Sequence, residues 1–218
     1  MKYKKFVYIY CIIFLILMIY LIESLSILTE QGDAKKMHTL HTKYTLKRYE
    51  TTISVSEYFE KYVNVAEFLE YCKVCPNYDR LWSCPSYDFS QEAYWKEYRE
   101  LFILGYKICF DEAVSKEESM EIMEKVKADI GKELFELEEI FPGSISLSAG
   151  SCSVCGKQNC TRPSGKPCRY PDKLRYSIES IGGNVGKTVH DLLGIELEWI
   201  QEDKVPNYFV LIGGLLKK

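Results

Sequence analysis

The sequence predicts an α+β fold, a single domain with a mixed sheet of about four to five strands, packed helices, two cysteine-rich loops and an N-terminal hydrophobic helix. Three observations predict it. Residues 101–110 form a continuous apolar run of strand length. Residues 115–140 carry apolar side chains at helical spacing. Seven of the nine cysteines fall in two clusters, within residues 72–84 and 152–168.

The size and charge of the chain restrict its class. A chain of 218 residues that is 47% hydrophobic, with 17 Tyr and 10 Phe, can bury one sizeable core. The formal net charge is −3, whereas a general nucleic-acid-binding domain would be strongly basic. We therefore expect one folded domain, 37–218, and no nucleic-acid partner.

The N-terminus carries an apolar segment, Phe6 to Ile22, without a charged residue. A helix of this length spans roughly 25 Å and reaches bilayer thickness if it continues to Leu28. The segment predicts an uncleaved membrane anchor through Phe6 to Leu28, and a signal peptide is the alternative, although no small-residue cleavage site follows.

The lysines on either side of this segment predict its orientation. More of them follow it than precede it, which places the folded domain on the cytoplasmic side of the membrane. A different reading is that the natural start is Met37. Residues 1–36 would then be an upstream extension and the domain would be cytoplasmic.

The remaining elements follow in order. Residues 42–54 alternate and are rich in Thr and Tyr, as in a strand, and 56–62 form a short helix. Asn64 is a candidate N-cap for a helix that leads into Cys72. Ser115 with Glu118 forms a capping box for the longest helix, which Pro142 ends. The other expected elements are helices at 91–99, 171–181 and 186–193 and strands at 101–110 (central), 144–149, 196–201 and 208–212.

The loop Ser151 to Pro171, here called the four-cysteine loop, predicts a metal site. Its four-cysteine set is Cys152, Cys155, Cys160 and Cys168. Two residues separate the first pair, so one turn can direct both sulfurs at one centre, and Gly and Pro residues let the chain turn back to deliver the others. The loop is also basic, as expected around bound thiolates. Disulfides are the alternative.

The stretch Tyr71 to Phe89, the three-cysteine loop, holds the three-cysteine set Cys72, Cys75 and Cys84. Cys75 and Cys84 precede prolines, a feature of iron–sulfur loops. Three thiols do not complete a tetrahedral site. A fourth ligand comes from elsewhere, or one position is open to a small molecule, or the set contributes to a centre shared with the four-cysteine loop.

The cysteine and histidine residues outside the two sets are not expected to be metal ligands. Cys109 lies in the predicted central strand as a small hydrophobic residue, and His190 lies on a helix surface. His38 and His41 are expected to be solvated. Gly186-Lys187-Thr188 looks like the end of a phosphate-binding loop. Such a loop requires a glycine five residues before Gly186, and that position is Ile181, so we expect no nucleotide binding there. No constellation of hydrolytic residues is recognisable, so the sequence leaves open whether the protein is an enzyme.

The two clusters resemble those of an uncharacterised prokaryotic family described as predicted metal-binding proteins. The resemblance covers about Tyr44 to Gly214. It depends on CxxC followed by Ser83-Cys84-Pro85, and on SAGSCSVC with a later PCRYP that contains Cys168. The chain departs from the family at Ser86, where a second proline is usual, and in its N-terminal hydrophobic segment. The resemblance implies metal binding and no particular reaction.

These observations favour an iron–sulfur protein. The four-cysteine set would hold a cluster of the 4Fe-4S type, and the three-cysteine set would hold or complete a second centre. The function would be electron transfer to a redox protein partner, or cofactor handling. The first alternative is a structural zinc-binding interaction module, and the second is an exported protein with disulfide bonds. The cysteine–proline pairs and the incomplete three-cysteine set favour iron.

Overall fold

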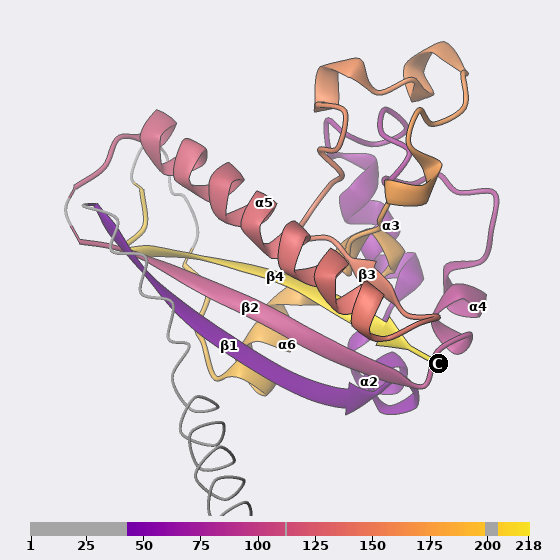
Figure 1. The fold of residues 1–218 in the computed structure, drawn as a ribbon, viewed down its shortest axis with the longest axis horizontal. Coiled ribbons are helices and arrows are strands. Elements are labelled where there is room, and N and C mark those ends of the chain that lie inside the picture. Colours follow the sequence, from indigo (N-terminus) through magenta and orange to yellow (C-terminus); the bar gives the residue numbers. More distant parts are fainter. Residues whose placement is uncertain (1–42, 112, 199–204) are drawn as a thin grey trace, which may run out of the picture. The chain divides into compact units, whose positions relative to one another are not determined.

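A four-stranded sheet with the strand order β1-β2-β4-β3 lies at the centre of the fold (Figure 1). The computed structural model describes residues 43–111, 113–198 and 205–218. Every strand pair is antiparallel, so the prediction of a mixed sheet is wrong, while the α+β class and a sheet of four strands are confirmed. The strands are β1 (Tyr44–Ser54), β2 (Glu100–Phe110), β3 (Ile145–Leu147) and β4 (Tyr208–Lys217).

The connection between β1 and β2 explains the antiparallel pairing. Ser54 at the end of β1 pairs with Glu100 at the start of β2, and the Val55 N–H donates to the Arg99 carbonyl at 2.8 Å. Residues 55–99 are therefore an insertion into a β-hairpin, and they return to the point where they left the sheet. The insertion contains the three-cysteine loop and the helices α2 (Val55–Tyr62), α3 (Val65–Lys73) and α4 (Gln91–Lys96).

Strand β2 is the central strand predicted from its continuous apolar run, because both faces of the sheet are covered (Figure 1). On one face Leu104 and Ile108 pack with the buried side of α5 (Lys116–Ile140). On the other face Leu101 and Ile103 pack with α2, α4 and α6 (Val185–Leu193). A strand that is buried on both sides has no polar face, which removes the usual alternation.

The segment after β3 differs from the prediction. The expected helix 171–181 is wrong, since only two single 3-10 turns form, η3 (Pro171–Lys173) and η4 (Glu179–Ile181). The chain between them is held beside the end of β3, where the Ser148 N–H donates to the Tyr176 carbonyl at 2.8 Å and Ser148 bridges to Ser177. These long-range bonds replace the helical ones. The expected strand 196–201 is absent at 196–198, and 199–201 lie outside the described residues.

Strand β4 is longer than predicted because it continues through Gly213 and Gly214. A Cβ on Gly213 would lie 2.7 Å from Leu134 Cδ1 and 2.8 Å from the Leu147 carbonyl oxygen. Helix α5 and strand β3 therefore approach β4 closely at this point. The glycine serves this close approach and does not end the strand.

Helix starts agree with the sequence. Asn64 caps α3 and Ser115 caps α5, each accepting from a backbone N–H three residues later. The expected anchor Phe6 to Leu28, with His38 and His41, lies outside the described residues. Among the helices of the described part of the chain, none has the length and hydropathy of a membrane span.

Candidate metal centre

The three-cysteine set lies where helix α3 ends. Cys72 is in the last turn of α3, and the N–H of Cys75 donates to the Cys72 carbonyl at 3.0 Å. A second turn follows, in which the Cys84 N–H donates to the Leu81 carbonyl at 3.0 Å. Cys84 is buried, Cys72 is half-buried and Cys75 is exposed. The turns thus gather the three residues at one end of α3 while leaving one thiol accessible.

Electrostatic effects show that the three thiols are neighbours. The pKa of Cys84 is raised to about 11, mainly by burial; a hydrogen bond from Ser83 lowers it, and the charges of Cys75 and Cys72 contribute to the rise. Burial also raises the pKa of Cys72, with added contributions from Glu179 and Cys75. Without a cation, the raised pKa values of Cys72 and Cys84 keep these two thiols protonated at neutral pH. A bound metal ion reverses this preference, because thiolates are its ligands and their protons are released on binding.

The four-cysteine loop is built from turns at glycines. Gly156 and Gly165 have φ values of 76° and 65°, in the left-handed region that glycine adopts without strain. The Gly156 N–H donates to the Ser153 carbonyl at 3.0 Å, which closes the turn between the first two cysteines. All four cysteines of the set are half-buried. Burial raises the pKa of Cys152, and the charges of Cys155 and Cys168 raise it too.

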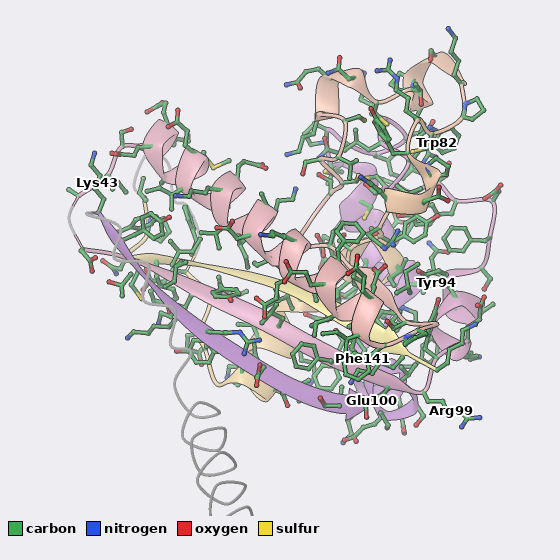
Figure 2. All side chains as sticks on the ribbon, viewed as in Figure 1. Lys43, Trp82, Tyr94, Arg99, Glu100 and Phe141 are labelled. Carbon is green, nitrogen blue, oxygen red and sulfur yellow. The ribbon has the colours of Figure 1, made fainter. Side chains whose placement is uncertain are left out.

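The two cysteine loops are in direct contact. The Cys152 N–H donates to Ser83 Oγ at 2.9 Å, although the two residues are 69 positions apart. Trp82 Nε1 donates to Thr161 Oγ1 at 3.2 Å, and Figure 2 labels Trp82 in this region beside the four-cysteine loop. The sequence identified both cysteine sets but did not show that their loops lie in contact in the folded chain.

Arg162 of the four-cysteine loop joins the three-cysteine loop through hydrogen bonds and an ion pair. Its Nη1 donates to the carbonyls of Leu81 at 3.0 Å and Cys84 at 2.5 Å, and its Nη2 pairs with Asp79 at 2.7 Å and also reaches the Ser86 carbonyl. The side chain is only 10% exposed. The sequence analysis interpreted the basic residues of the four-cysteine loop as a balance for thiolate charge. The structure shows that Arg162 also binds the backbone of the three-cysteine loop.

Glu179 is a candidate functional residue that the sequence analysis missed. Burial raises the pKa of its carboxyl group, against hydrogen bonds from its own N–H and from Ser177 and the charge of Lys127. Its charge in turn raises the pKa values of Cys72 and Cys84. The one signal available was an acidic residue placed between two isoleucines, Ile178 and Ile181. Carboxylates are metal ligands, so Glu179 is a donor that could complement three thiols.

Lys127 of α5 contacts the start of the four-cysteine loop. Its Nζ donates to the Ser151 carbonyl at 2.5 Å, next to Cys152. A Cβ on Gly150 would be 4.0 Å from this Nζ and 3.9 Å from Glu179 Oε1. Burial has the largest effect on the pKa of Lys127 and lowers it. The charges of Glu124, Cys152 and Glu179 raise this pKa, and the charge of Lys157 lowers it. Lys127 and Glu179 therefore both approach Gly150, just ahead of the four-cysteine loop.

The other sequence candidates stay outside this region. Cys109 lies in β2, opposite Tyr208 of β4, and is half-buried. His190 is exposed on α6, with Nδ1 2.8 Å from Asp191 and Nε2 3.0 Å from Glu196, as expected for a helix surface. The cysteines of residues 43–111, 113–198 and 205–218 are all free, so this part of the chain gives the disulfide alternative no support.

The candidate metal ligands lie in one region of the fold, but they do not converge on a single metal position. Within the described ranges, no three Cys, His, Asp or Glu side chains are arranged to hold a metal ion. The donor chemistry nevertheless fits a thiophilic metal, because free thiols, among them Cys84 and Cys152 with raised pKa values, are grouped in two loops built from turns.

A family model described as "Predicted metal-binding protein (DUF2284)" matches residues 58–216, a range that contains both cysteine loops and Glu179. No curated protein and no solved structure matches the chain.

Proposed function

Since the chain belongs to this family of predicted metal-binding proteins, we propose that it is an iron–sulfur protein with a role in electron transfer or cofactor handling. The observation that carries the proposal is the contact between the two cysteine loops. Cys152 N–H to Ser83 Oγ and the bonds of Arg162 bring seven cysteines from two distant segments into one region. A fold needs no such concentration of free thiols for stability alone.

The four-cysteine set would hold a cluster of the 4Fe-4S type, since four thiolates complete its coordination. The bound cluster would supply one-electron chemistry. Around it the chain supplies basic residues and the half-buried position of the thiols, which shield the site from water. An electron-transfer role requires a redox protein as partner.

The three-cysteine set would form a second centre with Glu179 as the fourth donor. The effect of Glu179 on the pKa values of Cys72 and Cys84 supports this choice among the alternatives that the sequence leaves open. A carboxylate binds iron less tightly than a thiolate and can be displaced. Such a centre would keep one position that a small molecule can take.

The second candidate is a structural zinc module. The turn in which the Cys75 N–H donates to the Cys72 carbonyl is compatible with a CxxC zinc site as well as with an iron–sulfur loop. Zinc in both sets would make the region a rigid interaction surface without redox chemistry.

The segment Phe6 to Leu28 bears on where this chemistry takes place. As an uncleaved anchor it would hold the domain at the cytoplasmic face of a membrane, where thiolates persist. With a natural start at Met37 the domain would be cytoplasmic.

Metal analysis of the full chain, purified without oxygen, tests the proposal. We expect iron and acid-labile sulfide in similar amounts, and little zinc. Cys152→Ser, Cys155→Ser, Cys160→Ser and Cys168→Ser should each remove the first centre, because an incomplete set leaves charged thiolates and an under-coordinated metal. Cys109→Ser is the matched control and should leave the metal content unchanged.

The same measurement tests Glu179. Glu179→Gln removes the negative donor and should lower the iron content of the second centre while leaving the first centre intact. Glu92→Gln on α4 is the control. Zinc in place of iron would establish the alternative, and a protein with neither metal would refute both proposals.

A further inference from the structure

A cleft of about 270 Å³ lies between helix α5 and the start of the four-cysteine loop. Figure 1 shows these two elements next to each other. The floor of the cleft is apolar, with Ala128, Leu134 and Phe135 of α5 and Ala149 ahead of the loop. An engineered apolar cavity of ~150 Å³ holds benzene, so this cleft has room for a ring and a small polar group.

The charged lining of the cleft is entirely cationic. Lys127, Lys132, Lys173 and Arg175 line it, and no Asp or Glu does. Arg175 is neutralised by Glu138 through Nε at 2.7 Å and Nη2 at 2.5 Å. Lys132 pairs with Glu136 at 3.9 Å. Lys173 is exposed, and its side chain forms no hydrogen bond or ion pair within the described ranges. An apolar floor below Lys127 and Lys173, whose side chains form no ion pair in the described part of the chain, selects an organic anion over a neutral or cationic molecule.

Cys152 also lines the cleft. A molecule bound there would contact the side chain proposed above as a ligand of the first centre. We propose that this cleft binds a small organic carboxylate, with its apolar part on α5 and its carboxylate at Lys127 and Lys173, directly beside Cys152. This inference deepens the proposed function, on which it rests, by naming the class of molecule that reaches the metal region.

Gly131 provides a way to block the cleft without disturbing the fold. It lies in the middle of α5 and lines the cleft, and a Cβ built on it meets nothing within 4 Å. Gly131→Leu would therefore place a side chain in the cleft. Since leucine is a better helix former than glycine, the melting temperature should not fall.

Benzoate is a suitable probe, and calorimetric titration of the full chain, purified without oxygen, measures its binding. We expect Gly131→Leu to weaken binding at least 10-fold and Lys173→Gln about 3-fold. Lys125→Gln, on α5 but outside the lining, should bind as the unmodified protein does. Benzamide, the neutral analogue, should bind at least 10-fold more weakly than benzoate. In the iron-loaded protein, benzoate should also change the electron paramagnetic resonance spectrum of the reduced centre.

The outcomes separate this inference from the proposed function. Benzoate binding that Gly131→Leu abolishes supports the cleft whether the protein holds iron or zinc, and zinc would overturn only the iron proposal. An iron-loaded protein that fails to bind benzoate, or binds it equally well in Gly131→Leu, overturns the carboxylate site and leaves the iron proposal standing. Binding of inorganic phosphate but not benzoate also overturns it.

Discussion

At the scale of single residues, the polar side chains that hold this region act across long distances in sequence. Arg162 contacts residues about 80 positions earlier, and Glu179 affects thiols about 100 positions earlier. Neither residue belongs to a recognisable motif. Their functions follow from a buried position beside particular carbonyls and thiols, which is a property of the fold.

Glu138 of α5 illustrates how such a residue adds stability. Its carboxylate accepts from Arg175 at 2.7 and 2.5 Å and from the Ser146 N–H at 2.6 Å. Side-chain exposure is 15% for Glu138 and 13% for Arg175, so water screens this pair only weakly. The pair joins α5 to β3 and to the segment that follows the four-cysteine loop.

We predict that Glu138→Gln lowers the free energy of unfolding at pH 7 by about 2 kcal/mol, the usual contribution of hydrogen bonds to a charged group. Burial of Glu138 favours protonation, but the hydrogen bonds from Arg175 and Ser146 outweigh it and hold the pKa below its usual 4.5. A lowered pKa stabilises the fold above pH 4.5, and that contribution is lost as pH falls through the folded-state pKa.

Urea unfolding between pH 7 and pH 3 measures this effect. The unmodified protein should lose stability below about pH 5 more steeply than Glu138→Gln. Glu139→Gln, at an exposed neighbouring position of α5, is the control and should follow the unmodified protein. Parallel pH profiles for the Glu138→Gln and unmodified proteins would contradict the assignment.

At the scale of elements, the two cysteine loops depend on each other. The three-cysteine loop belongs to the insertion in the β1–β2 hairpin, and the four-cysteine loop belongs to the connection between β3 and β4. Each loop contains little regular structure of its own. Arg162, Ser83 and Trp82 supply the bonds between them, so the conformation of one loop is set by the presence of the other.

We predict that Arg162→Lys loosens the three-cysteine loop. Lysine keeps the charge, but its single ammonium group cannot reproduce the planar guanidinium that reaches Leu81, Cys84 and Asp79 together. Metal retention by the three-cysteine set should fall ~10-fold, as is common when groups that orient ligands are removed. Competition with a chelator measures retention, and limited proteolysis should cut within 74–89 sooner.

Arg169→Lys, an exposed position in the same loop, is the matched control for Arg162→Lys and should retain metal normally. Equal metal retention and equal proteolysis in the two variants would show that Arg162 has no special function in joining the loops.

At the scale of the whole molecule, the described residues supply two buried clusters, one on each face of the sheet. The α5 face includes Val126, Ile130 and Leu134, and the opposite face includes Trp95 and Tyr58. The Trp95 Nε1 donates to the Ile181 carbonyl at 2.8 Å, so even the largest buried side chain is hydrogen-bonded. The family match at 58–216 covers most of this domain.

We predict that a chain starting at Met37 folds independently. Its melting temperature should lie within about 4 °C of that of the full chain, since the two core clusters lie after residue 43. Iron content per chain should be equal in the two proteins. An insoluble shorter protein, or one that loses its metal while the full chain keeps it, would show that residues 1–36 take part in the fold.

The sequence by itself determined the features that depend on neighbouring residues. Asn64 and Ser115 as helix starts, the central strand from its apolar run, and α5 from its periodicity were all predictable, because capping and burial patterns repeat over a few positions. The cysteine spacing also identified the seven candidate ligands, whose function as ligands stays a prediction.

Only the tertiary structure decided how these pieces meet. The antiparallel return of β2, the replacement of the expected helix 171–181 by strand-like pairing at Ser148, and the extension of β4 through Gly213 all arise from contacts between distant segments. The joining of the two loops by Arg162 and the position of Glu179 have the same origin. Local patterns fix backbone preference, but the burial of a charge and the choice of its partner depend on which surfaces the folded chain brings together.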